Sequence, residues 1–383
     1  MSGIYIHIPF CVKRCIYCDF YSNTDMKYKD AYMSALLREM EMRSGYLNNE
    51  RISTIYLGGG TPSQLHPCEI EKIFDGIYRI FPVTDTPEIT IEANPDDLSD
   101  DYVTLLRKTL PVNRISIGVQ SFDNKDLLLL NRRHTAEEAI EAVRRCKDLG
   151  LTNISIDLIY GLPGQTAEAW SQNIDKALSL DVPHISAYNL TYEEGAVISG
   201  MMERNEIEPV DDDSCEQFFR ILKDKLEAGG FSHYEISNFA KRSDSYPEGR
   251  ISLHNSSYWS DNHYLGIGAS ASSYDGVSRS QNISSITGYI KAIDEGRTDF
   301  IETEWLSERE MYNDFIITHL RTMWGVSLNE LERRFGERRK RYFLNKSESL
   351  ISKKILNIYG DNVKVSYEGI FISDAIIRHL IAL

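Results

Sequence analysis

Long apolar runs are missing from this sequence of 383 residues. No uninterrupted stretch reaches the roughly 18 apolar residues that a membrane-spanning helix needs. The first ten residues, MSGIYIHIPF, also lack the basic segment and long apolar core of a secretion signal. The sequence therefore predicts a cytosolic protein without a transmembrane segment, and it leaves only peripheral contact with a membrane open.

Positive charge is also scarce, because 42 lysines and arginines face 57 aspartates and glutamates and leave a net charge of −15. Such a surface repels a phosphate backbone, so we expect no nucleic-acid partner and no role in nucleic-acid modification. The run RRFGERRKR at 333–341 is a local exception. We interpret it as a solvated helix face, with an anionic docking site as the alternative.

Cysteine is rare too, and six are too few for a disulfide framework in a chain of this length. Cys11, Cys15 and Cys18 are nevertheless packed into CVKRCIYC. Three thiolates on one loop suit three irons of a [4Fe-4S] cluster. No fourth cysteine follows, so one iron stays open for the amino and carboxylate groups of S-adenosylmethionine. A zinc loop is the alternative, although structural zinc takes four ligands.

Short β-rich runs alternate with segments of helical period, which predicts an α/β fold built on a parallel sheet. Six such units indicate an incomplete (β/α)6 barrel, whose chemistry should lie just after each strand. The predicted strands are IYIHI from Ile4, TIYL from Thr54, EITIEA from Glu88, RISIGV from Arg114, ISIDLIY from Ile154 and HISAYNL from His184.

Helix start signals support these units. Ser99 precedes one helical segment, and Thr135 with Glu138 forms a capping box before another.

We predict a core over 1–235, an extension of the core over 236–300, and a small helical, winged-helix-like module over 301–383. In that module we expect a capping box at Ser327 and Glu330, the hairpin ILNIYGDNVKV and a closing helix.

Polar residues follow several of the predicted strands. The turn Gly58-Gly59-Gly60-Thr61-Pro62 comes after the second strand, where absent side chains would let backbone amides approach a ligand. Glu92 and Gln120 end the third and fourth strands, and Asp157 lies within the fifth. Each could reach the barrel mouth, although a single charge at such a place is more often half of an ion pair.

The run IHIPFCVKRCIYCDF resembles the cluster loop of the radical S-adenosylmethionine superfamily, in the branch that contains HemN and HemW, and the likeness covers nearly the whole chain. It implies a radical SAM barrel, a [4Fe-4S] cluster and an electron donor of flavodoxin or ferredoxin type. It also implies that S-adenosylmethionine is bound by Tyr5, Tyr17, Gly59, Gly60, Thr61, Glu92, Gln120, Arg132 and Asp157.

A further cysteine two residues after the cluster motif is typical of the oxidases of this branch, and Phe20 stands there in this chain. The run from His254 to Trp259 instead matches the HNxxYW motif of the heme chaperones. It implies that heme or a porphyrin is bound by His254, Asn255, Tyr258 and Trp259 and passed to a heme-acceptor protein. A histidine can ligate heme iron while aromatic rings cover the macrocycle.

Two hypotheses therefore stay open, and with them the question of whether the protein is an enzyme. The first is a heme chaperone; the second is an oxygen-independent coproporphyrinogen III oxidase, which forms protoporphyrinogen IX. One departure from the resemblance is Ser272, which stands where the chaperones have a histidine in GAHS. Any contact made by that histidine is in doubt here.

Overall fold

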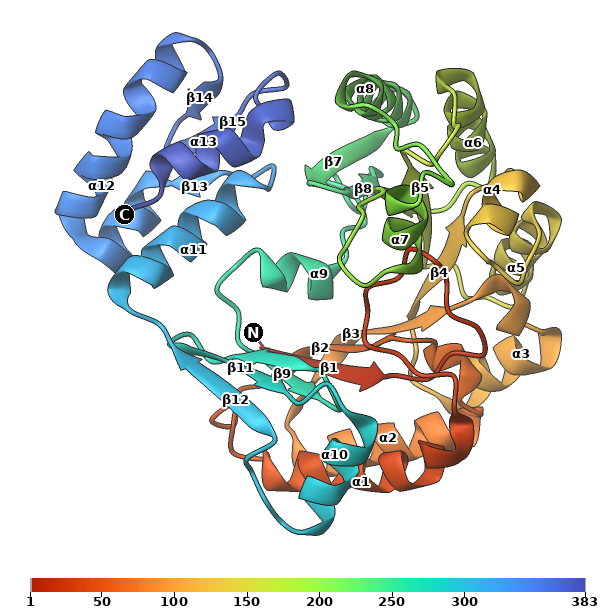
Figure 1. Cartoon of the computed structure of the whole chain (residues 1–383). Coiled ribbons are helices and arrows are strands. Elements are labelled where there is room, and N and C mark those ends of the chain that lie inside the picture. Colours follow the sequence, from red (N-terminus) through yellow and green to blue (C-terminus); the bar gives the residue numbers. More distant parts are fainter. Residues whose placement is uncertain (1, 383) are drawn as a thin grey trace.

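The computed structural model describes residues 2–382, and a sheet with six central parallel strands forms its core (Figure 1). These strands lie side by side in sequence order, which confirms the predicted incomplete barrel. Their bounds are β1 Ser2–Ile8, β2 Ile52–Gly59, β3 Val83–Ala93, β4 Arg114–Gln120, β5 Ile154–Tyr160 and β6 His184–Asn189.

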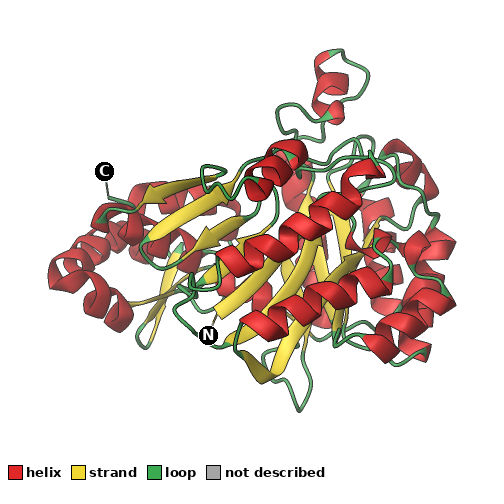
Figure 2. Cartoon of the chain, turned by 90° about the horizontal axis from the view of Figure 1, so that it is seen from below, coloured by secondary structure: helices red, strands yellow, loops and turns green. Residues whose placement is uncertain are grey.

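Helices cover the outer face of these strands (Figure 2), and apolar side chains from both layers form one large core. The predicted caps are present, because Ser99 accepts a hydrogen bond from the Tyr102 amide and Thr135 forms a reciprocal box with Glu138. The helices are α1 Lys29–Met42, α2 Pro67–Ile80, α3 Asp100–Thr109, α4 Asn124–Leu129, α5 Ala136–Asp148, α6 Ala167–Ser179, α7 Val197–Glu203 and α8 Asp212–Ala228.

The sheet continues beyond the six strands at both edges. On the β6 side, β8 (Asn238–Lys241) and then β7 (Phe231–Glu235) join antiparallel. On the β1 side, β9 (Tyr264–Ile267) pairs parallel, and antiparallel strands follow it. These are β10 Ser272–Tyr274, β11 Ser278–Asn282 and β12 Ile301–Trp305. The segment between the two edges contains α9 (Leu253–Tyr258), whereas α10 (Ile286–Asp294) packs on α1.

The C-terminal module has its own apolar core around Tyr312, Phe315 and Phe343. Its helices lie against a three-stranded sheet of order β13-β15-β14, which includes the predicted hairpin. The elements are α11 Glu308–Leu320, β13 Val326–Ser327, α12 Leu328–Ser352, β14 Leu356–Tyr359, β15 Asn362–Val365 and α13 Ser373–Leu380. Short 3-10 helices elsewhere cover Met26–Tyr28, Pro62–Gln64, Pro95–Asp97 and Ile370–Ile372.

The predicted capping box of α12 is only half correct. Ser327 accepts a hydrogen bond from the Glu330 amide, but the Glu330 carboxylate pairs with Arg333. Asp361, on the hairpin, takes the hydrogen bond of the Ser327 hydroxyl instead. The start of α12 is therefore held in part by a carboxylate of the hairpin, which also accepts the Asn329 amide and which the local sequence pattern does not reveal.

Most basic side chains of the run at 333–341 form ion pairs on and around α12, but Gly336, with φ +77° and ψ 168°, interrupts the helix within the run, so the run is not one continuous helix face. Lys340 pairs with Glu332 at 2.6 Å and Arg341 with Glu337 at 3.2 Å, while Arg334 reaches Asp261 in the core extension.

None of the helices within residues 2–382 has the length and apolar character to cross a membrane.

Candidate functional site

A cavity of about 460 Å³ opens at the carboxyl ends of the parallel strands, where the sequence placed the chemistry. It is lined by the three motif cysteines and by eight of the nine residues expected to bind S-adenosylmethionine. Those eight are Tyr17, Gly59, Gly60, Thr61, Glu92, Gln120, Arg132 and Asp157. Residues that are far apart in sequence therefore meet because consecutive parallel strands end at one rim.

The cysteine loop follows β1 and is fixed by its backbone. The Cys11 amide donates to Asn23 O at 3.0 Å, and the Cys18 amide donates to Cys15 O at 3.3 Å. Burial raises the pKa of the Cys11 thiol, and burial raises that of Cys18 to about 11. These thiols therefore stay protonated near neutral pH until a metal centre with high positive charge displaces their protons.

No group of three or more His, Cys, Asp or Glu side chains within residues 2–382 converges closely enough to hold a single metal ion. This geometry disfavours the zinc alternative, because zinc needs four donors around one ion. A cubane cluster, in contrast, places each cysteine on a different iron. The three thiols that line one cavity, with Phe20 in place of a fourth, fit that donor set.

The glycine turn after β2 packs against the cysteine loop. A Cβ on Gly60 would lie 2.7 Å from Ile8 O, and one on Gly59, where φ is +106°, would lie 2.4 Å from the His7 ring. The amides of Gly60 and Thr61 donate to Ile8 O and Phe10 O. The expectation that these amides face a ligand is therefore wrong, since they hold the loop to β2 instead.

Two carboxylates lie inside the cavity and differ in their partners. Glu92 accepts hydrogen bonds from Tyr56 Oη at 2.7 Å and from the Gly59 amide at 3.0 Å. Burial raises its pKa to about 7. Burial also raises the pKa of Asp157, which accepts a hydrogen bond from Ser116 Oγ at 3.2 Å. Both groups can therefore stabilise a cationic ligand by ionising when it binds.

Arg132 joins the cluster loop to the carboxyl end of β4. Its Nη1 donates to Cys15 Sγ at 3.3 Å, and its Nη2 donates to Asn94 Oδ1 and Gly118 O, both at 2.6 Å. Gln120 adopts a left-handed conformation with φ +68°. A backbone held in this sparsely populated region is common where a side chain is aimed at a ligand.

Helix α9, which carries the HNxxYW motif, packs against β1 and β2. Glu88 caps its start, because its carboxylate accepts the amides of Leu253 and His254 at 3.0 and 2.9 Å. The buried His254 ring stacks on Tyr56, with the ring centroids 4.9 Å apart. Asn255 reaches the wall of the barrel cavity, so part of the motif belongs to the cosubstrate region.

Both ring nitrogens of His254 are hydrogen-bonded within the protein. Nδ1 lies 2.8 Å from Thr54 Oγ1, and Nε2 lies 2.9 Å from Tyr258 Oη. Burial lowers the pKa of this imidazole to about 3, so it is neutral at physiological pH. Ligation of heme iron by His254 stays a prediction, and it would require one of these hydrogen bonds to break.

Some residues named from the sequence lie outside the cavity, and the cavity contains other residues that were not predicted. The hydroxyl of Tyr5 hydrogen-bonds to His7 Nδ1 at 3.0 Å, and Tyr5 is not among the lining residues; Ser272 is exposed on β10. The cavity also includes side chains that the sequence analysis did not select, namely Tyr56, Asn94, Ser116, Ser186, Tyr188 and Asn189. Asn94 directly follows β3 and Tyr188 and Asn189 end β6, so their positions at the strand ends were a signal, whereas Tyr56, Ser116 and Ser186 lie within strands.

Comparisons with known proteins agree with this geometry. The family model for the radical SAM superfamily matches residues 5–177, and the model for the HemN C-terminal domain matches residues 306–372. The fold is similar to that of the coproporphyrinogen III oxidase HemN from Escherichia coli, with a TM-score of 0.85 at 22% identity over 100% of this chain and 90% of that one.

Relatives with similar sequences cover nearly the whole chain. The heme chaperone HemW of Bacillus subtilis strain 168 is 34% identical over 96% of both chains. The heme chaperone HemW of Lactococcus lactis is 35% identical over 95% of this chain and 92% of that protein. With its cysteine loop, its HNxxYW helix and its C-terminal module in the same chain, this protein belongs to the HemW family of the radical SAM superfamily.

Proposed function

We propose that this protein is a heme chaperone that holds a [4Fe-4S] cluster on Cys11, Cys15 and Cys18, binds S-adenosylmethionine in the barrel cavity and delivers heme to acceptor proteins. The observation that carries the proposal is similarity along the full length to proteins described as heme chaperones. Phe20, 67% exposed at the cavity, supports it because the oxidases carry a cysteine there.

The residues of the cavity suit the cosubstrate. The buried Nε of Arg132 has no hydrogen-bond partner among residues 2–382 and can donate to a carboxylate beside the cluster, and Glu92 can receive an ammonium group or ribose hydroxyls. A bound cluster would supply single electrons, which a flavodoxin- or ferredoxin-like donor replenishes. The chain itself contributes orientation, because Tyr56 and the Gly59 amide fix the Glu92 carboxylate before any ligand arrives.

Heme is expected next to α9, the helix that is formed by the HNxxYW motif. Anaerobic titration with ferric protoporphyrin IX, followed by mixing with a heme-free acceptor such as apomyoglobin, tests the proposal. We expect one heme per chain and transfer to the acceptor within minutes. A chain that binds no heme, or never releases it, would contradict the function.

The same titration on His254→Ala separates two roles of that residue. A direct ligand should change the heme absorption spectrum when it is removed, whereas a residue that only shapes α9 should lower thermal stability and leave the spectrum of bound heme unchanged. Thr54→Val is the matched control, since it removes one hydrogen bond of His254 and leaves the imidazole in place.

The alternative function is that of an oxidase that decarboxylates coproporphyrinogen III. We consider it because the fold is similar to that of HemN. Anaerobic incubation with reductant, S-adenosylmethionine and coproporphyrinogen III distinguishes the two functions. Accumulation of protoporphyrinogen IX would favour the oxidase, and unchanged substrate beside a loaded cluster would favour the chaperone.

A further inference from the structure

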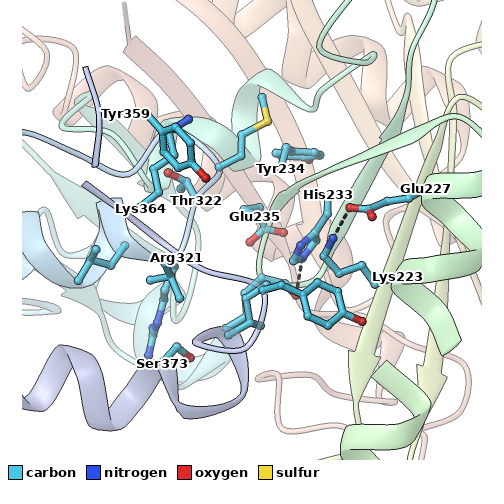
Figure 3. Close-up of a pocket in the computed structure, with 16 residues that line it drawn as sticks. Lys223, Glu227, His233, Tyr234, Glu235, Arg321, Thr322, Tyr359, Lys364 and Ser373 are labelled. Atoms are coloured by element: carbon cyan, nitrogen blue, oxygen red, sulfur yellow. Dashed lines mark hydrogen bonds and ion pairs between the residues drawn. The ribbon is translucent and has the colours of Figure 1, made fainter. Parts of the chain in front are cut away.

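A second cavity, of about 390 Å³, lies between the barrel and the C-terminal module (Figure 3). One wall is formed by α8 and β7 and carries Lys223, His233 and Glu235; the opposite wall carries Arg321, Tyr359 and Lys364. The backbone closes one end, where the Met323 amide donates to Tyr234 O at 2.9 Å. We call this cavity the seam cleft. Its volume falls in the range of small-molecule sites.

Apolar and aromatic side chains form about half of the lining of the seam cleft. Tyr234, Leu320 and Val365 line it, together with two side chains that remain exposed. Those two are Ile236, which is 37% exposed, and Tyr359, which is 60% exposed. A flat apolar ligand would remove both from water, which is favourable by about 25 cal/mol for each Å² covered.

Cationic groups lie among these apolar side chains. Lys364 makes no ion pair with any residue between 2 and 382, and Lys223, which is 9% exposed, pairs with Glu227. The Nε of Arg321 is buried and has no hydrogen-bond partner among the described residues, although its Nη2 pairs with Asp374. An orphaned buried donor in a cavity wall favours a ligand with acceptor oxygens.

The seam cleft also contains donors for iron and a connection to α9. His233 is stacked on Phe239 and lines the cleft together with Met323, and both imidazole and thioether are ligands of heme iron. The Nε2 of His233 lies 3.3 Å from Ile236 O, so ligation through this nitrogen would require that hydrogen bond to break. Burial lowers the pKa of His233 to about 4, which keeps it neutral. Glu235, in the wall, is a neighbour of the Trp259 side chain at the end of the HNxxYW motif.

We propose that the seam cleft is the heme site, with the macrocycle between Ile236 and Tyr359 and the propionates toward Lys364 and Arg321. This inference rests on the proposed function and specifies where the heme is held. The HNxxYW motif then connects the two cavities, because Asn255 lines the cosubstrate side and Trp259 is a neighbour of Glu235 in the wall of the seam cleft. Heme would thus bind beside the motif rather than on His254.

Two variants of the cleft test this site by titration of the whole chain with ferric protoporphyrin IX. Lys364→Glu reverses the charge of a side chain that has no ion pair among the described residues and lies 5.8 Å from the centre of the Tyr359 ring, and Ile236→Trp fills the cleft from an exposed position. We expect each to weaken heme binding at least about tenfold, which corresponds to about 1.4 kcal/mol. Lys353→Glu, the same charge reversal at an exposed position outside the cleft, should leave the affinity within about twofold.

The outcomes separate this inference from the proposed function. Heme binding of wild-type strength in both cleft variants would overturn the seam cleft as the site while leaving the chaperone intact. A wild-type chain that binds no heme would overturn the chaperone itself. Melting temperatures of the three variants, measured in parallel, show whether a weakened affinity reflects the site or loss of the fold.

Discussion

The barrel cavity and the seam cleft are built in different ways. In the barrel cavity, short side chains on strand ends are fixed by backbone and hydrogen bonds, as with Glu92 and Asp157. In the seam cleft, long side chains such as Lys223 and Lys364 come from two modules, and the hydrogen bond between Met323 and Tyr234 bridges them. The first arrangement suits a preorganised reactive centre, and the second suits cargo that must leave again.

A variant of the cluster site gives the strongest test of whether the two cavities act independently. We expect Cys15→Ser to reduce bound iron from about four atoms per chain to below one, because a cubane cannot be held by two thiolates. Heme affinity should stay within about threefold, since the seam cleft contains none of the cluster ligands. Anaerobic iron and sulfide analysis with heme titration measures both, and Cys68→Ser, exposed on α2, is the control. Loss of heme binding together with the cluster would make the two cavities one functional unit.

The next largest effect is expected where the cysteine loop packs on the glycine turn. Gly60→Ala places a Cβ 2.7 Å from Ile8 O and 2.9 Å from Phe10 N, so the loop must move. Overpacking of this kind costs about 1–3 kcal/mol. We expect a lower melting temperature and at least tenfold weaker S-adenosylmethionine binding by calorimetry. Gly45→Ala, where a Cβ would meet no atom within 4 Å, is the matched control and should leave both values unchanged.

The barrel cavity could be predicted from the sequence because the strands that form it have local sequence signals. Glu92, Gln120 and Asp157 lie in or at the end of strands that their β-rich composition predicts, so their place near the cavity could be predicted, and the resemblance joined them into one site. The partners of His254 were not foreseen, because Thr54 lies 200 residues away and no pattern joins the two. The seam cleft was missed for the same reason: it exists only after the C-terminal module packs against β7.

Acid should act on both regions through buried neutral histidines. Burial lowers the pKa of His254, on the barrel side, to about 3 and that of His233, in the seam cleft, to about 4. The unfolded pKa is about 6.5, so the neutral form stabilises the fold above that pH and this stability is lost as the pH falls toward 4 and 3. At pH 5 each costs up to about 2 kcal/mol relative to pH 7.

Urea unfolding at pH 7 and pH 5 measures this loss of stability. We expect His254→Gln and His233→Gln each to reduce the difference between the two pH values, and His66→Gln, which changes an exposed histidine, to leave it as in the wild type. If neither His254→Gln nor His233→Gln changed the loss of stability between pH 7 and pH 5, protonation of other groups would have to explain acid unfolding. Neither region would then depend on pH through its buried histidine.

The smallest expected effect concerns the charge of Glu92. Because burial raises its pKa to about 7, the carboxyl is mostly neutral at pH 6 and mostly ionised at pH 8. A cationic ligand prefers the ionised form, so S-adenosylmethionine should bind about fivefold more tightly at pH 8 than at pH 6. Glu92→Gln should remove this pH dependence and weaken binding at pH 8, while heme binding in the seam cleft stays unchanged at both pH values. A pH dependence that persists in Glu92→Gln would assign the proton to another group, with Asp157 the next carboxyl in the cavity.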